Sequence, residues 1–283
     1  MMANATQELD THINRLHSNG RLRVWSLIIT FFGDAVALRG GRVGLAALQD
    51  AMALLNIEQG AVRTAMSRLA QDGWVARERK GRLSFYSLTP QGRFAFDEAT
   101  RRIYSPGPPD WDGDWTIAIS GGDNTTEISS RGFIHLSGPA WIKPGHESEF
   151  APVDVLIIRG HSSDFPPALT SLWQLDGLDA AYRSFCHNWQ DFRTSSLTPA
   201  QALTARTLLV HDWRRIVLRD PDLPYALMRN DWPGKTALEL MRRIYTGLAS
   251  QSEAWLDAAG LPQPTEPRKL ASRLITLQTI AKK

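Results

Sequence analysis

The stretch between residues 45 and 88 constrains the fold more than any other part of the sequence. Apolar residues recur at helical spacing over Leu45–Leu55, and a two-residue turn separates this segment from a second predicted helix, Glu58–Gln71. One face of the second helix is apolar and comprises Val62, Ala65, Met66 and Leu69. Two strand-like runs follow, Trp74–Arg79 and Arg82–Leu88, and Lys80-Gly81 between them is a hairpin signal. Two short helices followed by a hairpin predict a winged helix-turn-helix.

The outer face of the second helix carries polar and cationic side chains that could contact nucleic acid. These residues are Arg63, Thr64, Ser67 and Arg68. Both arginines can donate to base edges and phosphates in a major groove. The hairpin tip adds Arg79, Lys80 and Arg82, which can lie along a phosphate backbone. A solvated helix face is the alternative for any single arginine, but the helix face and the hairpin tip together favour DNA binding.

Three sequence segments occur in order along the chain. They are AVRTAMSRLAQDGWVARERKGRLSFYSLTPQGR (Ala61–Arg93), WDGDWTIAI (Trp111–Ile119) and LRDPDLPYALMRNDWPG (Leu218–Gly234). In this order they resemble the PaaX-type repressors of phenylacetic acid catabolism. The first resembles the family's DNA-binding module, the second the opening of its middle domain and the third its C-terminal signature. Together the three span almost the whole chain.

The resemblance implies a fold and a function. The fold is α+β, with an N-terminal winged helix-turn-helix, a ferredoxin-like middle domain and a mainly helical C-terminal domain. The function is that of a cytoplasmic, homodimeric transcriptional repressor, which binds double-stranded operator DNA. Phenylacetyl-CoA or a related aryl-CoA is the implied effector, and its binding releases the DNA.

The proline-rich segment Ser105–Asp110 is the clearest domain boundary, because its prolines end the preceding helix. We expect a flexible arm over residues 1–20, the winged helix over 21–104, the middle domain over 111–190 and an effector and dimerisation domain over 191–283. Formal charge supports the division: the chain totals +3, and residues 105–190 are acidic between two basic ends. The acidic middle segment would repel DNA phosphates.

A CoA ester needs cations for its phosphates and an apolar slot for its acyl group. The C-terminal segment offers both kinds of side chain, so the candidate effector residues are Trp213, Arg214, Arg215, Arg219, Tyr225, Arg229 and Trp232. The alternative is that the aromatic rings are core and the arginines form ion pairs with neighbouring aspartates. The resemblance does not place these residues in a pocket.

Motifs of enzymes are mostly absent, so we expect no catalytic residues, no metal ligands and no cofactor. The sequence contains no GxSxG, Walker loop, HExxH or paired CxxC motif. Two alternatives stay open, a CoA-ester-using enzyme and a metal-dependent nuclease built on the middle domain, for which Asp114 and Asp123 are the nearest carboxylates. No apolar run reaches the roughly 18 residues of a membrane span, and the first residues lack the features of a secretory signal.

Overall fold

The computed structural model describes residues 5–18, 20–122, 124–146, 153–162 and 166–264. The fold is α+β, as predicted. The chain divides into two compact units. The first unit comprises Met1–Pro106, Phe185–Leu218 and Ala237–Lys283, and the second comprises Gly107–Ser184 and Arg219–Thr236. This division differs from the three modules expected from sequence, because most of the C-terminal helical segment belongs to the unit that contains the winged helix.

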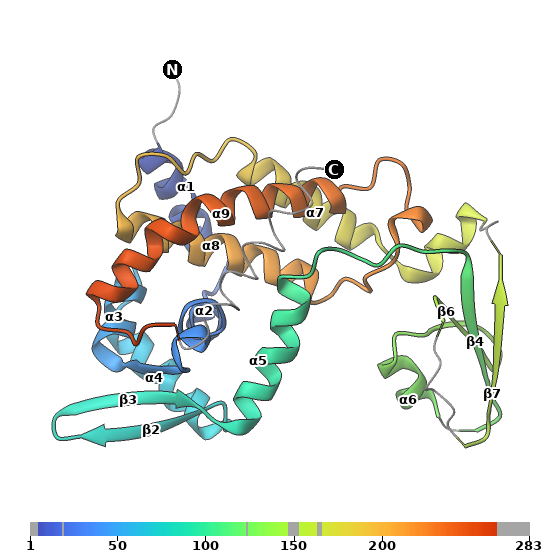
Figure 1. Cartoon of the computed structure of the whole chain (residues 1–283), viewed down its shortest axis with the longest axis horizontal. Helices are drawn as coiled ribbons and strands as arrows, with labels where there is room; N and C mark the ends of the chain where they lie inside the picture. Colours follow the sequence, from blue (N-terminus) through green and yellow to red (C-terminus); the bar gives the residue numbers. More distant parts are fainter. Residues whose placement is uncertain (1–4, 19, 123, 147–152, 163–165, 265–283) are drawn as a thin grey trace. The chain divides into compact units, whose positions relative to one another are not determined.

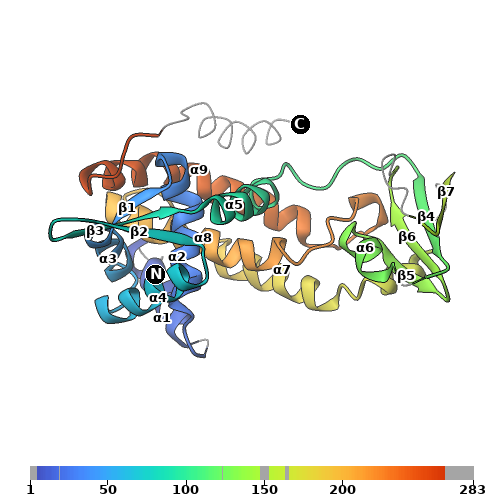
Figure 2. The same cartoon turned by 90° about the horizontal axis from the view of Figure 1, so that it is seen from below.

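The winged helix-turn-helix lies within the first unit. Its elements are α2 (Val24–Phe31), β1 (Arg42–Gly44), α3 (Leu45–Ala53), α4 (Gln59–Gln71), β2 (Val75–Lys80), β3 (Leu83–Leu88) and α5 (Pro90–Ile103). The strands form an antiparallel sheet in the order β1-β3-β2. The hairpin of β2 and β3 is the wing, and it extends away from the helices of the unit (Figures 1 and 2). Strand β1 was not predicted, since three residues are too few for a periodic signal.

Local sequence signals set the ends of these elements correctly. All four apolar residues predicted on one face of α4 are buried, and α4 packs against α2 and α3. Thr89 caps α5, because its hydroxyl accepts a hydrogen bond from the backbone N–H of Gly92. Pro90 occupies the first turn, where its missing N–H costs nothing.

Two expectations for the N-terminal part are wrong. Residues 5–18 are no flexible arm but an amphipathic helix, α1 (Ala5–Ser18), which buries Leu9, His12 and Ile13 and packs against α8. The apolar, helix-length segment Arg21–Phe32 is followed by a glycine, and this pattern predicts that the helix ends at Gly33. Instead the chain continues through a π-helix, η1 (Phe32–Val36), and a 3-10 turn, η2 (Ala37–Arg39). The ring of Phe96 packs against Gly33 within the π-helix, where a Cβ would lie only 2.8 Å from that ring.

The two long C-terminal helices complete the first unit. Helix α8 (Pro199–Val217) begins with a capping box, in which the Thr198 hydroxyl accepts from the backbone N–H of Gln201 and the Gln201 side chain accepts from the backbone N–H of Thr198. Helix α9 (Gly234–Ala258) begins within the second unit and continues into the first. Most residues of α8 are buried, so this helix is a central element of the core.

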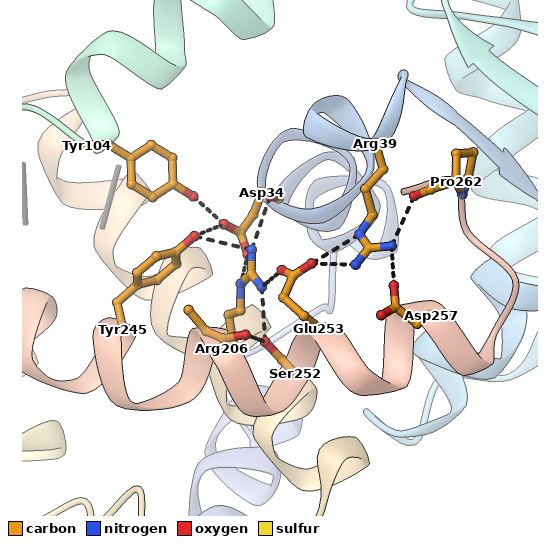
Figure 3. A network of polar contacts seen from close by, with 10 residues as sticks. Asp34, Arg39, Tyr104, Arg206, Tyr245, Ser252, Glu253, Asp257 and Pro262 are labelled. Atoms are coloured by element: carbon orange, nitrogen blue, oxygen red, sulfur yellow. Dashed lines mark hydrogen bonds and ion pairs between the residues drawn. The ribbon is translucent and has the colours of Figure 1, made fainter. Parts of the chain in front are cut away.

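A buried charge network connects the winged helix to these two helices (Figure 3). The Asp34 carboxylate, on the π-helix, accepts from Arg206 Nε of α8 at 2.6 Å and from the hydroxyl groups of Tyr104 and Tyr245. Arg206 also donates to Glu253 of α9 at 2.6 Å. The side chain of Arg206 is fully buried and that of Asp34 is 3% exposed. Such groups stay charged in a core only because each has a partner.

The second unit contains a four-stranded antiparallel sheet in the order β5-β6-β4-β7. Its elements are β4 (Asp114–Ser120), α6 (Thr125–Ser130), β5 (Ile134–Ser137), β6 (Ala140–Pro144), β7 (Val155–His161), η3 (Pro167–Trp173), α7 (Asp176–Trp189) and η4 (Tyr225–Leu227). This order and the β4-α6-β5 crossover agree with a ferredoxin-like sheet. The described residues between β6 and β7 form no helix there, so the second crossover of that fold is not seen in this part of the chain.

Candidate nucleic-acid interface

Helix α4 presents a continuous polar face. Arg63, Thr64, Ser67 and Arg68 are all exposed, and together with Gln71 and Asp72 they line one hollow of the surface. The face exists because the apolar residues of α4 recur every three or four positions and are all buried. The structure therefore brings together the four helix residues that the sequence predicted.

The polar side chains of this face make only local, exposed contacts. Arg63 donates to the Gln59 side chain at 3.4 Å, and Arg68 Nε lies 3.7 Å from an Asp72 carboxylate oxygen, with the two side chains 71% and 52% exposed. Exposed pairs of this kind contribute about 0–1 kcal/mol. Both guanidinium groups can therefore exchange these contacts for phosphate or base contacts at little cost.

The wing ends in a two-residue turn that displays the predicted cations. Lys80 pairs with Leu83, so Gly81 and Arg82 form the turn, and Gly81 has the positive φ of 62° that the first position of such a turn requires. Arg79 Nε donates to the Gly81 carbonyl at 3.0 Å, which closes the tip. All three tip cations, Arg79, Lys80 and Arg82, are exposed.

One acidic residue lies among the wing cations. Glu78 accepts from Arg42 at 3.0 Å and lies 3.4 Å from Lys80 Nζ. The hydrogen bond from Arg42, and to a lesser degree the charge of Lys80, hold the pKa of Glu78 below its usual value. Glu78 therefore stays ionised at neutral pH and orders the base of the wing, while the tip keeps its positive charge.

Two of the three predicted effector residues of α8, Trp213 and Arg214, contact other parts of the first unit. Trp213 is 2% exposed, and its indole N–H donates to the Ile103 carbonyl at 2.9 Å. Arg214 donates to Thr30 at 2.7 Å and to Ser26 of α2. Burial, together with the neighbouring Arg215, lowers the pKa of Arg214 to about 10. Arg215 is exposed and, like Trp213 and Arg214, belongs to the first unit.

The remaining predicted effector residues lie in the second unit. Arg219 is exposed and Tyr225 is half-buried. Arg229 donates to Asp179 at 2.8 Å and forms an ion pair with Asp231 at 3.3 Å. Arg229 and Trp232 are the two of this set that line a cavity of about 840 Å³. The expected set is therefore divided between the two units, with Trp213 and Arg214 serving as structural residues.

Sequence reasoning missed most of this cavity. Trp111, Gln174 and Leu175 line it together with Met228. The signals that could have indicated it are the two tryptophan-containing motifs WDGDW and RNDW, which come together in the second unit although about 120 positions separate them in the sequence.

The two open alternatives were a CoA-ester-using enzyme and a metal-dependent nuclease. In that part of the chain no three His, Cys, Asp or Glu side chains are grouped so as to hold a metal ion. Asp123, one of the two carboxylates considered for a nuclease, lies outside the described residues, and Asp114 is 3.2 Å from His161 Nδ1. None of the described helices combines the length and apolar character needed to cross a membrane.

Comparisons with known proteins agree with this geometry. Residues 23–92 match the PaaX-like protein family, and residues 173–258 match the PaaX-like protein C-terminal domain. The transcriptional repressor PaaX of Escherichia coli K12 is 30% identical, over 89% of this chain and 89% of that protein. A solved structure of an uncharacterized protein from Mycobacterium tuberculosis covers 74% of this chain and 90% of its own, with a TM-score of 0.50 and 20% identity, and shows a similar fold. The chain belongs to the PaaX-type family of transcriptional repressors.

Proposed function

We propose that this protein represses genes of aromatic, phenylacetate-type catabolism by binding operator DNA through α4 and the wing. The observation that carries the proposal is the separation of faces on α4, where four apolar residues are buried and four donor-rich residues are exposed side by side. An α-helix with such a face fits the major groove, while a basic wing contacts the flanking backbone. A repressor of this kind acts in the cytoplasm.

Arg63 and Arg68 are the side chains that we expect to read the operator. Replacing both with alanine should reduce affinity for the operator by about 100-fold or more, since a specific arginine contact contributes roughly 1–3 kcal/mol. The measurement is a mobility shift with DNA from upstream of the gene, at fixed salt concentration. The preference for operator over unrelated DNA should fall as well.

A matched control removes the same charge elsewhere. Arg101→Ala with Lys235→Ala eliminates two exposed cations that lie neither on the α4 face nor on the wing. This pair should change operator affinity by much less than the α4 pair. Equal losses in the two double variants would mean that the α4 face does not read DNA.

The wing should contribute affinity without sequence preference. Lys80→Ala and Arg82→Ala should each weaken binding to operator and unrelated DNA by similar factors. Each should also reduce the salt dependence of log K by about one, because one phosphate contact is lost. Binding measured over a series of salt concentrations tests this expectation, and a change confined to operator DNA would contradict it.

The proposed function includes release by an effector, phenylacetyl-CoA or a related aryl-CoA. The resemblance supports this class of ligand. A 100-fold release requires about 2.7 kcal/mol of coupling between ligand and DNA, so the thioester must bind the DNA-free state preferentially. In a mobility shift, phenylacetyl-CoA should dissociate the operator complex, whereas CoA alone should not.

The repressor is proposed to act as a homodimer. Two protomers would place their α4 helices in half-sites separated by about one helical turn, roughly 34–36 Å, or a multiple of it. Sedimentation with and without operator DNA measures the number of protomers, and footprinting gives the spacing of the half-sites. A single protected half-site bound by one protomer would contradict the dimer.

A further inference from the structure

The glycine at the second position of α4 is not required by the fold. Gly60 has no positive φ, and a Cβ built on it would meet nothing within 4 Å. Alanine is a better helix former than glycine, so the fold alone would favour a side chain at this position. A glycine also lets another molecule approach the backbone closely. Gly60 is exposed at the start of the polar face, where the approaching molecule would be DNA.

Small side chains continue from Gly60 along the centre of the polar face. Residues three and four positions apart lie on the same side of a helix, so Gly60, Thr64 and Ser67 form one row. The Thr64 hydroxyl donates to the Gly60 carbonyl at 3.0 Å and therefore lies against the helix. The longer side chains of Gln59 and Arg63 lie to one side of this row. A helix of this shape can enter a groove deeply while its long side chains reach base edges.

Gln59 and Arg63 form a coupled pair at the N-terminal end of α4. Both are exposed, and Arg63 Nη2 donates to Gln59 Oε1 at 3.4 Å. An amide oxygen has two lone pairs, so it can accept from Arg63 and from a base at the same time. Glutamine matches the N6 and N7 edge of adenine, and arginine matches the O6 and N7 edge of guanine. Stacked base pairs lie about 3.4 Å apart, so the two side chains fit neighbouring base pairs.

Contacts with α1 and α3 hold the first turn of α4 in position. Gln49 of α3 donates to the Gln59 carbonyl at 3.4 Å. His17 of α1 donates from Nε2 to the Leu55 carbonyl at 2.8 Å, in the turn that precedes α4. Groups that are ordered before binding lose less entropy when they bind. The N-terminal end of α4 is thus an ordered surface, and it is the end of a recognition helix that contacts base edges in helix-turn-helix proteins.

We propose that Gln59 reads an adenine in the major groove beside a guanine read by Arg63, and that Gly60 lets α4 approach closely enough for both contacts. The inference rests on the proposed function, because it names the base pairs that the α4 face selects. Each operator half-site should therefore contain a guanine and an adenine on neighbouring base pairs. Gln59 is in this sense a specificity-determining residue.

Selection of binding sites from randomised DNA by the full chain tests the base assignment. The half-site selected by the native protein should contain the neighbouring guanine and adenine. Any other base pair at the adenine position should weaken binding by about 5- to 150-fold. Gln59→Ala should lose this preference and keep the preference for guanine. Gln7→Ala replaces an exposed glutamine of α1 and is the control, which should keep both preferences.

A modified base identifies the atom that Gln59 contacts. Adenine replaced by 7-deazaadenine lacks the N7 acceptor, so it should weaken binding of the native protein but cause no further loss for Gln59→Ala. A selected half-site without the two neighbouring bases would overturn the assignment. Equal sensitivity of native protein and Gln59→Ala to 7-deazaadenine would do so as well. The double variant of Arg63 and Arg68 tests the proposed function separately, so either can fail alone.

A methyl group at Gly60 tests the close approach. Gly60→Ala should weaken operator binding by about 5- to 100-fold, as expected for an extra methyl group in a packed interface, while the midpoint of urea unfolding stays the same or rises. Gly177 is a matched position, because it is the second residue of α7, is exposed, and has nothing within 4 Å of a Cβ. Gly177→Ala should keep operator affinity. Unchanged operator binding by Gly60→Ala would overturn the role assigned to this glycine.

Discussion

Replacing Arg206 with methionine is expected to lower the free energy of unfolding by about 3–5 kcal/mol, a large part of a typical domain's stability. The reason is the environment of Asp34. Its side chain is 3% exposed, and Arg206 is the cation in contact with it, at 2.6 Å. Without the guanidinium, the buried carboxylate would keep the hydrogen bonds from the Tyr104 and Tyr245 hydroxyl groups but would lose the positive charge that compensates it.

Urea unfolding measures this loss, and a second substitution tests its cause. Adding Asp34→Asn to the Arg206→Met variant should recover part of the stability, because the uncompensated charge is then removed together with its partner. Arg243→Met is the control, because Arg243 is an exposed arginine of the neighbouring helix α9 that donates to the Gln190 carbonyl. Its effect should stay within about 0.5 kcal/mol. Additive losses in the double variant would show that the two residues are not coupled.

The same network gives α8 and α9 a role in holding the winged helix. Asp34 and Arg39 lie on the irregular segment between α2 and β1, and their partners Arg206 and Glu253 lie on α8 and α9. Arg39, whose side chain is 2% exposed, also donates to Asp257 and to the Pro262 carbonyl. Hydrogen bonds between arginine and carboxylate groups require a defined geometry, so they fix the position of the segment that precedes α3 and α4.

Sequence reasoning predicted the elements whose signals are local. The apolar spacing of α4 and the glycine at the wing tip each depend on residues a few positions apart, and each was placed correctly. The exposed cations of the α4 face and the wing followed directly from that spacing. Their contacts with DNA remain a prediction.

Features that depend on distant residues could not be predicted. Arg206 and Asp34 are 172 positions apart, and nothing in the sequence around either one identifies its partner. Trp213 and Trp232 both stand beside charged residues in the sequence, yet the first is in the core of α8 and the second lines a cavity. The roles of these two tryptophans follow from how deeply each is buried, which the neighbouring sequence does not indicate. The lone Asp34 within the apolar run Phe31–Val36 was an available sign that a buried partner was needed.

Lowering the pH from 7.5 to 5 is expected to destabilise the first unit through His12 and His211. Burial, and secondarily the charge of nearby arginines, lowers the pKa of each from 6.5 to about 3. His12 stacks on Trp189 at 3.8 Å and its Nδ1 faces Arg15, whereas Nδ1 of His211 lies 3.0 Å from the Thr30 hydroxyl. Both positions therefore accept the neutral ring and resist the imidazolium.

The sign of this pH dependence follows from whether the folded or the unfolded chain takes up the protons first. The unfolded chain binds protons near pH 6.5 and the folded chain only near pH 3, so stability is complete above 6.5 and declines as the pH falls between these values. At pH 5 the loss is about 2 kcal/mol for each histidine. Burial raises the pKa of Asp212, although the charge of Arg15 acts in the opposite direction. Asp212 therefore gains a proton more readily in the folded chain, which offsets part of the loss of stability at lower pH.

Urea unfolding at pH 7.5, 6 and 5 measures the effect, and histidine variants assign it. Asparagine can place an acceptor oxygen near the position of Nδ1 without titrating, so His12→Asn with His211→Asn should flatten the dependence of stability on pH, even if stability at pH 7.5 is lower. The exposed His187 of α7 provides the control His187→Asn, which should keep the full dependence of the native chain. A double variant as acid-sensitive as the native protein would show that other groups govern its stability at low pH, because neither replaced side chain could then bind the proton.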